Sequence, residues 1–236
     1  MKKISVIFVA VLLAGGFHGC KKECKLAPRT GYTIVGEGED CEYKKDSPDN
    51  GDTGGGTTVT ISSEVINGVT WATCNVDAPG TVAGKPSDYG MFYQWNRKKG
   101  WASTGETVSD WDNNTPSGST WEKANDPSPA GWRVPTLDEL ESLLDEDKVS
   151  NEWTTLDGVN GRQFTDKATG KSIFFPATGY RDKSSSILYH QSIKGYYWSN
   201  TLNNNEKPLY LYFLVDNAQI YYDDGGFGHP IRCVAE

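Results

Sequence analysis

The clearest pattern of hydrophobic and polar positions is a stripe of leucines at helical spacing, Leu137, Leu140, Leu143 and Leu144. Residues three and four positions apart share one face of a helix, so the stripe predicts a short amphipathic helix. Thr136 and Glu139 form the Thr-x-x-Glu capping box that marks a helix start. We therefore expect a helix that begins after Thr136 and packs its leucines against an antiparallel sheet from the C-terminal third of the chain.

Strand patterns surround this helix. Asn67-Gly68 separates two apolar runs within residues 65–71, which is typical of a hairpin with a type I′ turn. Residues 209–215 alternate, with Tyr210 and Tyr212 on the side opposite Leu211 and Phe213. Further strands are expected at residues 161–165, 171–175, 196–199, 219–222 and 230–234. Successive strands with short turns predict an antiparallel sheet, and together with the helix they indicate an α+β domain.

Residues 75–129 form a long stretch, rich in Gly and Pro, with little periodic pattern. Loops of this length are uncommon unless they pack on themselves or carry function. The stretch contains Trp101, Trp111 and Trp121, interleaved with Asn, Ser and Thr. These tryptophans could stack on a sugar, or they could supply the core that a long loop needs, and the core interpretation is preferred.

The N-terminus has the features of an export signal. Basic residues precede an apolar run, 4–13, that is shorter than the roughly 20 residues needed to span a membrane. Gly19-Cys20 then resembles a bacterial lipobox, which makes residues 1–19 a lipoprotein signal and Cys20 the lipid attachment site; ordinary signal cleavage is the alternative. Residues 20–58 are polar and are interpreted as a flexible tether, and residues 59–236 as the folded domain.

The net charge bears on which partners the protein can bind, and the cysteine content bears on disulfides and metal sites. The net charge is -8, and the chain lacks the basic stripe that neutralises phosphates, which argues against nucleic acid. In an oxidising compartment, an even number of cysteines besides Cys20 favours disulfides. Local closure pairs Cys24 with Cys41, within the tether, and leaves Cys74 for Cys233. Metal-binding thiols are the alternative, but the sequence has no Cys-x-x-Cys spacing.

Candidate catalytic and metal-binding residues are few. His190 and His229 lie in no nucleophile elbow and no His-Glu-x-x-His motif, so both are interpreted as structural. Arg133 could bind an acidic ligand, but a bond to the acidic helix start is preferred. Weak candidates for calcium are Asp216, Asp223 and Asp224. A polar turn of this composition is more often solvated, so we expect no metal, no cofactor and no catalytic site.

The chain also carries six ordered blocks: NGVTWATCNV, YGMFYQW, SPAGWRVPTLDEL, FFPATGY, YYWSN and PIRCV. In this order they resemble the Fibrobacter succinogenes major paralogous domain, a family common in lipoproteins of gut and rumen bacteria, over residues 59–236. The resemblance implies a C-type lectin-like fold, which is shared with the formylglycine-generating enzyme. Such a fold has a small antiparallel or mixed sheet, one or two flanking helices, long loop regions and adjacent terminal strands.

Two departures from these relatives bear on chemistry. Family members often have a cysteine where this chain has Ser128, placed to bond the closing-strand cysteine, so Cys233 must here pair with Cys74 or stay reduced. The formylglycine-generating enzyme uses two reactive cysteines near its C-terminus with copper, and only Cys233 lies in that region. The resemblance therefore implies a protein without this enzymatic activity.

The sequence thus predicts a non-enzymatic binding or adhesion module, lipid-anchored at the cell envelope, on the outer membrane or cell surface. Its expected partners are the membrane, through the lipid, and an extracellular glycan or protein. One alternative is a carbohydrate-binding protein that uses the loop tryptophans, and the other is an enzyme of the formylglycine-generating type. Because fold does not fix function, these remain expectations.

Overall fold

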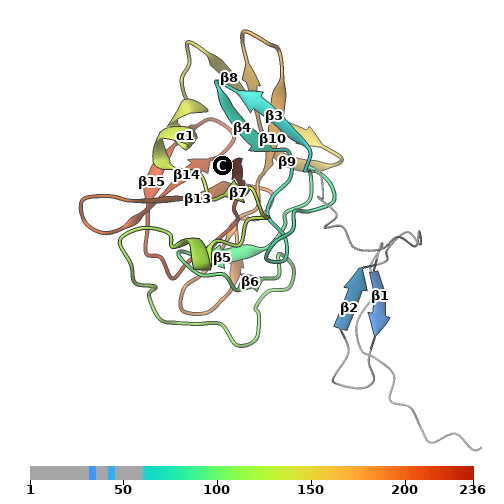
Figure 1. The fold of residues 1–236 in the computed structure, drawn as a ribbon, viewed down its shortest axis with the longest axis vertical. Coiled ribbons are helices and arrows are strands. Elements are labelled where there is room, and N and C mark those ends of the chain that lie inside the picture. The colour runs from blue at the N-terminus through green and yellow to red at the C-terminus, as the bar shows by residue number, and fades with distance from the viewer. Residues whose placement is uncertain (1–31, 36–41, 46–60) are drawn as a thin grey trace, which may run out of the picture. The chain divides into compact units, whose positions relative to one another are not determined.

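The computed structural model describes residues 32–35, 42–45 and 61–236. The chain divides into two compact units, residues 1–58 and 59–236. In the first unit, β1 (Tyr32–Val35) pairs antiparallel with β2 (Glu42–Lys45) (Figure 1). The segment interpreted as a flexible tether therefore contains a short hairpin. The predicted signal peptide, Cys20, Cys24 and Cys41 lie outside the described residues.

The second unit is built from four antiparallel sheets. One sheet has the order β3 (Ser63–Ile66), β4 (Val69–Ala72), β17 (Val234–Ala235), β7 (Trp132–Arg133). A second has the order β10 (Ser172–Pro176), β9 (Val159–Asp166), β8 (Val149–Leu156). The third has the order β12 (Leu188–Tyr189), β11 (Tyr180–Arg181), β16 (Gly228–His229), β5 (Phe92–Gln94), β6 (Gly100–Trp101). The fourth has the order β13 (Gly195–Leu202), β14 (Pro208–Phe213), β15 (Ala218–Tyr222).

The predicted α+β class, and with it the lectin-like arrangement of one sheet with flanking helices, is wrong. Strands account for 37% of the structure and helices for 5%, so the fold is β-rich. The described residues contain one α-helix, α1 (Leu137–Ser142), and one 3₁₀ turn, Lys123–Asn125. The leucine pattern predicted the position of the helix correctly but suggested a longer helix than the structure has. Leu143, a member of the pattern, is already the C-cap residue. β8 was not predicted from the sequence. Along most of this strand, exposed residues alternate with buried or partly buried ones.

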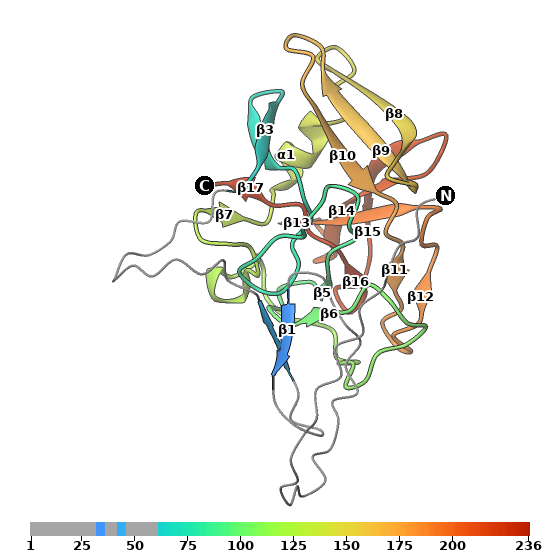
Figure 2. The ribbon, with the colours of Figure 1, turned by 90° about the vertical axis from the view of Figure 1, so that its right-hand side faces the viewer.

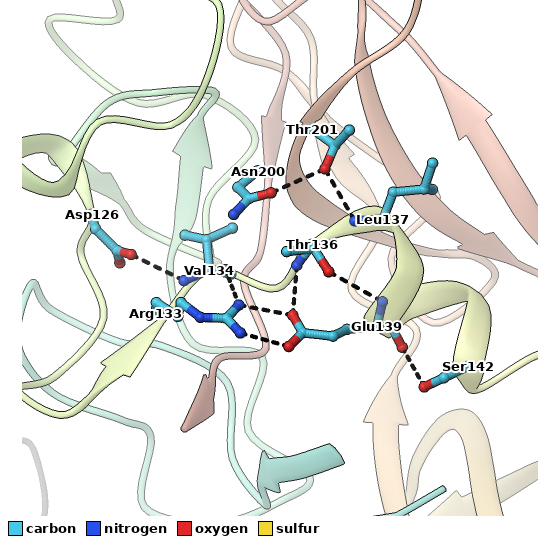
Figure 3. Close-up of polar contacts among 9 residues, drawn as sticks. All are labelled: Asp126, Arg133, Val134, Thr136, Leu137, Glu139, Ser142, Asn200 and Thr201. Carbon is cyan, nitrogen blue, oxygen red and sulfur yellow. Dashed lines mark hydrogen bonds and ion pairs between the residues drawn. The ribbon is translucent and has the colours of Figure 1, made fainter. Parts of the chain in front are cut away.

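The predicted helix start is confirmed. The Thr136 side chain accepts a hydrogen bond from the Glu139 amide, and the Glu139 carboxylate accepts one from the Thr136 amide (Figure 3). The same carboxylate accepts hydrogen bonds from both Arg133 Nη atoms, at 2.8 and 2.6 Å. Burial alone raises the pKa of Glu139, but hydrogen bonds from Arg133 and Thr136 outweigh burial and lower it. The preferred interpretation of Arg133, a bond to the acidic helix start, is therefore confirmed.

The leucine face of α1 packs against the C-terminal sheet, as predicted. Leu140 and Leu143 are fully buried and share one core cluster with Leu211 and Phe213 of β14 and with Tyr197 of β13. Figure 2 shows the β13–β14–β15 sheet between α1 and the β11–β16 strands. One face of this sheet is therefore occupied by the helix, which leaves the other face for the neighbouring sheet.

The long stretch before α1 is held by a buried arginine. Arg181 is fully buried and donates hydrogen bonds to the carbonyls of Ala102 at 2.8 Å and Thr104 at 2.7 Å. It also donates to the Ser186 carbonyl at 2.7 Å. Because the guanidinium has five donors in a fixed fork, it can fix several loop carbonyls at once. The loop therefore packs on the domain by its backbone as well as by its tryptophans.

The two ends of the second unit lie side by side, as the sequence analysis expected. Val234 of β17 pairs with Trp71 of β4, and the Ala72 amide donates to the Cys233 carbonyl at 3.0 Å. Cys74 and Cys233 are nevertheless free and buried, which corrects the predicted disulfide. Both cysteines lie beyond the regular β4–β17 ladder, where the backbone pairing shifts between the Ala72–Cys233 and Val76–Ile231 hydrogen bonds. Burial raises the pKa of Cys233 to about 12, so this thiol stays protonated.

Candidate ligand-binding pocket

The second face of the β13–β14–β15 sheet carries tyrosines. Tyr196 pairs with Tyr212 across β13 and β14, and Tyr210 pairs with Tyr221 across β14 and β15. Successive side chains of a strand point to opposite faces, so these four tyrosines lie opposite the α1 face. The alternation predicted along β14 is confirmed, since its intervening residues enter the core beneath α1. Three strands thus present a continuous aromatic surface.

A cavity of about 370 Å³, here called the tyrosine pocket, is formed over this surface. Its remaining wall comes from another sheet: Tyr180 from β11, His229 from β16 and Phe227 just before β16. Its full lining is Tyr180, Tyr196, Tyr210, Tyr212, Gln219, Tyr221, Asp223, Phe227 and His229. The volume lies at the lower end of the range of about 300–1,000 Å³ that is typical of small-molecule sites.

The rings of the pocket support one another. Tyr180 and Tyr196 have centroids 5.0 Å apart at 62°, and Tyr196 and Tyr212 have centroids 5.2 Å apart at 63°. Phe227 meets Tyr180 at 5.6 Å and 72°. Edge-to-face pairs of this kind are favourable, so each ring restrains its neighbour. The walls are therefore held in place without a ligand.

His229 contributes a buried polar group to the lining. It is 1% exposed, and its imidazole stacks on Trp198 with ring centroids 3.9 Å apart. Burial lowers the pKa of His229 well below its usual value, so the ring is neutral. Its Nδ1 atom is buried and has no hydrogen-bond partner among the described residues. A buried polar atom without a partner costs about 1–3 kcal/mol.

Asp223 is the charged group of the pocket. Its carboxylate accepts the Asp224 amide at 2.8 Å but forms no ion pair within the described part of the chain. Burial raises the pKa of Asp223, and the charge of Asp224 adds to this. The nearby lysines bind Asp224 instead: Lys183 Nζ lies 3.0 Å and Lys207 Nζ 3.7 Å from its carboxylate. Both lysines also lower the pKa of Asp223 electrostatically, but neither is within ion-pair distance of its carboxylate.

The other polar groups of the pocket are neutral. Burial raises the pKa of Tyr196 and of Tyr210, so their hydroxyls stay protonated. Gln219 adds an amide that can donate and accept. The pocket therefore offers ring faces, neutral hydrogen-bonding groups and one carboxylate, a combination suited to recognition of a small ligand.

The three tryptophans singled out from the sequence do not form one platform. Trp121 is 7% exposed, packs edge-on against Trp95 and donates its Nε1 hydrogen to the Asn125 carbonyl. Trp101 is 5% exposed and contacts Trp111, with ring centroids 5.0 Å apart. A second hollow borders Trp101, but Lys99 Nζ lies over its ring, 4.0 Å from the centroid. The preferred interpretation, that these side chains build the core of the loop, agrees with Trp101 and Trp121, whereas Trp111 is half-buried.

The weak calcium candidates also separate. Asp224 is engaged by Lys183 and by the Thr115 hydroxyl, whereas Asp223 faces the tyrosine pocket. Asp216 acts electrostatically on Arg162. Within the described ranges, no group of three His, Cys, Asp or Glu side chains is placed to hold a metal ion. Of these candidates, only Asp223 belongs to the pocket.

Sequence reasoning missed most of the pocket. Tyr210 and Tyr212 carried a usable signal, because they are aromatic residues on the strand face opposite Leu211 and Phe213, where they belong to or pack against a second core cluster. Tyr180, Phe227 and His229 carried none, since only the tertiary fold brings β11 and β16 to this sheet. His229 was interpreted as structural, but its unpartnered nitrogen and its place in the lining give it a second role.

No protein-family model matches the chain, and no curated protein or solved structure shows significant similarity to it. Among the residues that the structure describes, no helix is both long and apolar enough to cross a bilayer.

Proposed function

We propose that this protein is a non-enzymatic binding module that holds a small ligand, or the end group of a larger one, in the tyrosine pocket. The observation that carries the proposal is the preformed aromatic cavity, whose lining includes the neutral imidazole of His229 and the carboxylate of Asp223. Preorganised walls favour binding because little conformational entropy is lost when the ligand enters. The pocket replaces the loop tryptophans as the site of recognition.

The proposal includes a cellular location. The Gly19-Cys20 step after an apolar run supports lipid attachment at Cys20 and an outer-membrane or cell-surface position. A module placed there meets extracellular molecules, so its ligand is expected outside the cell. Adhesion is the corresponding role if the ligand is the end group of a surface polymer or protein.

The test uses the lipid-free mature chain and ligand-observed NMR with four probes: glucose, N-acetylglucosamine, choline and benzoate. We expect saturable binding of at least one probe, recovered unchanged afterwards. Tyr221→Ala should weaken that binding, because Tyr221 lines the pocket, while Tyr222→Ala should not. The two tyrosines are neighbours and each is 52% exposed, which makes them a matched pair. The proposal is wrong if no probe responds to Tyr221→Ala, or if the bound probe is converted into a product.

A further inference from the structure

We propose that the ligand of the tyrosine pocket is an organic cation, of the alkylated ammonium class that includes choline. This inference rests on the proposed function and adds the chemical class of the ligand. It is argued from the ring arrangement, the carboxylate that lacks an ion pair and the two lysines that already lie against lining rings.

The walls have the composition of a cation site. Six aromatic rings line the cavity, five from tyrosines and one from Phe227. The face of an aromatic ring carries negative charge density, and rings that meet at steep angles can surround an ammonium group on several sides. Recognition of quaternary ammonium groups by such cages is a general use of cation–π attraction. Neutral saccharides, by contrast, are typically held by hydrogen bonds to their hydroxyl groups.

The charge balance favours a cation. Asp223 faces the cavity, while Lys183 and Lys207 are both directed to Asp224. His229 is neutral, so the lining holds one negative charge and no positive charge. Burying a charge is costly unless it is paired. Lys183 and Lys207 act on Asp223 electrostatically without an ion pair, so a cationic ligand can supply the direct ion pair that Asp223 lacks.

Two lysines show that lining rings already attract ammonium groups. Lys194 Nζ lies 5.7 Å from the centroid of Tyr212, and Lys183 Nζ lies 5.9 Å from that of Phe227. Both distances are within the roughly 6 Å over which cation–π attraction acts. Neither lysine lines the cavity. A primary ammonium is strongly hydrated, whereas an alkylated one gives up water more readily, so the interior suits the latter.

The experiment compares choline with 3,3-dimethyl-1-butanol, which has the same shape but no charge, by titration calorimetry on the lipid-free mature chain. We expect choline to bind at least tenfold more tightly than the neutral compound. Asp223→Asn should remove most of that difference, and Tyr221→Ala should weaken choline about tenfold. Tyr221→Phe should stay within about twofold of the natural protein, because a phenyl ring keeps the cation–π contact. Tyr222→Ala is the control: Tyr222 stacks on Tyr221 but does not line the cavity, so choline affinity should stay within about twofold of the natural protein.

Methyl glucoside separates the failure of this inference from the failure of the proposed function. Equal binding of choline and its neutral isostere, or no effect of Asp223→Asn on choline, would overturn the cation assignment. If methyl glucoside binds, loses affinity in Tyr221→Phe and choline does not bind, the module stands but its ligand is a saccharide. If none of the three compounds binds, the tyrosine pocket is not a small-ligand site and both proposals fall.

Discussion

Replacing His229 with phenylalanine tests the physical description of the pocket most directly. His229 is 1% exposed, and its Nδ1 atom has no partner among the described residues. Removing such an atom recovers about 1–3 kcal/mol, while a near-isosteric swap in a packed site costs less than about 1.5 kcal/mol. The phenyl ring can keep the stack on Trp198. We therefore expect His229→Phe to gain about 1 kcal/mol at neutral pH, or roughly 2–4 °C in Tm for a domain of this size.

The same variant should change how stability depends on pH. Burial lowers the pKa of His229 in the folded protein, so the unfolded chain takes up a proton first as pH falls. The stability due to neutral His229 is thus present above the unfolded pKa of about 6.5 and is lost below it at about 1.4 kcal/mol per pH unit. That loss continues until the folded pKa is reached. His229→Phe should lack this slope.

Urea denaturation of both proteins at pH 7.5, 6.5 and 5.5 measures the effect. The difference between them isolates His229, because His190, whose pKa burial also lowers, is present in both. Parallel pH dependences would show that His229 is not a buried neutral group, and a loss of stability at pH 7.5 would show that its nitrogen is satisfied. Choline titration of the folded variant should give an affinity within about twofold of the natural protein, since a phenyl ring keeps an aromatic wall at this position.

Three further predictions address the helix cap, the pocket charge and the anchor. Glu139→Ala should lower the free energy of unfolding by about 2–3 kcal/mol in urea denaturation, because it removes a capping box and a paired carboxylate. Arg133→Lys, which keeps the charge but not the fork, should cost less, and equal losses would contradict this account. Choline affinity in calorimetry should fall as pH decreases through the pKa of Asp223, which burial holds above 3.8, because protonation removes the attracting charge; affinity unchanged down to pH 4 would contradict it. Cys20→Ala should move the protein from the membrane fraction to the soluble fraction and abolish fatty-acid labelling, whereas Cys74→Ala should do neither.

Local elements could be predicted from the sequence because their causes are local. The Thr136–Glu139 capping box and the Asn67-Gly68 turn each lie within a few residues, and both occur as predicted. Asn67 and Gly68 have φ of 47° and 79°, the left-handed values that a type I′ turn requires. The fold class failed for the opposite reason. The number of sheets depends on which strands pair, and that is decided by packing between segments far apart in the chain.

The cysteines and the pocket also show that local features could be predicted, whereas contacts between distant segments could not. Adjacent terminal strands were expected and are present, yet Cys74 and Cys233 lie just outside the ladder, where the backbone pairing shifts, and no local pattern encodes that shift. The aromatic face of β14 could be predicted from its alternation, but the wall that makes it a pocket comes from Tyr180 and His229 on another sheet. Tryptophans drew attention as binding residues because of their size, and size is also why a long loop buries them.

The position of the pocket explains how a small domain can keep a costly site. Leu140 and Leu143 of α1 pack against one face of the β13–β14–β15 sheet. The tyrosine rings on its other face belong to the same three strands. Because neighbouring residues of a strand serve the two faces alternately, fixing the core side fixes the ring side as well. The free energy from the buried leucines and the capped helix therefore offsets the unpartnered nitrogen of His229 and the half-buried charge of Asp223. Variants that loosen α1 should weaken ligand binding only in proportion to unfolding, whereas variants of the lining should weaken it in a fully folded protein.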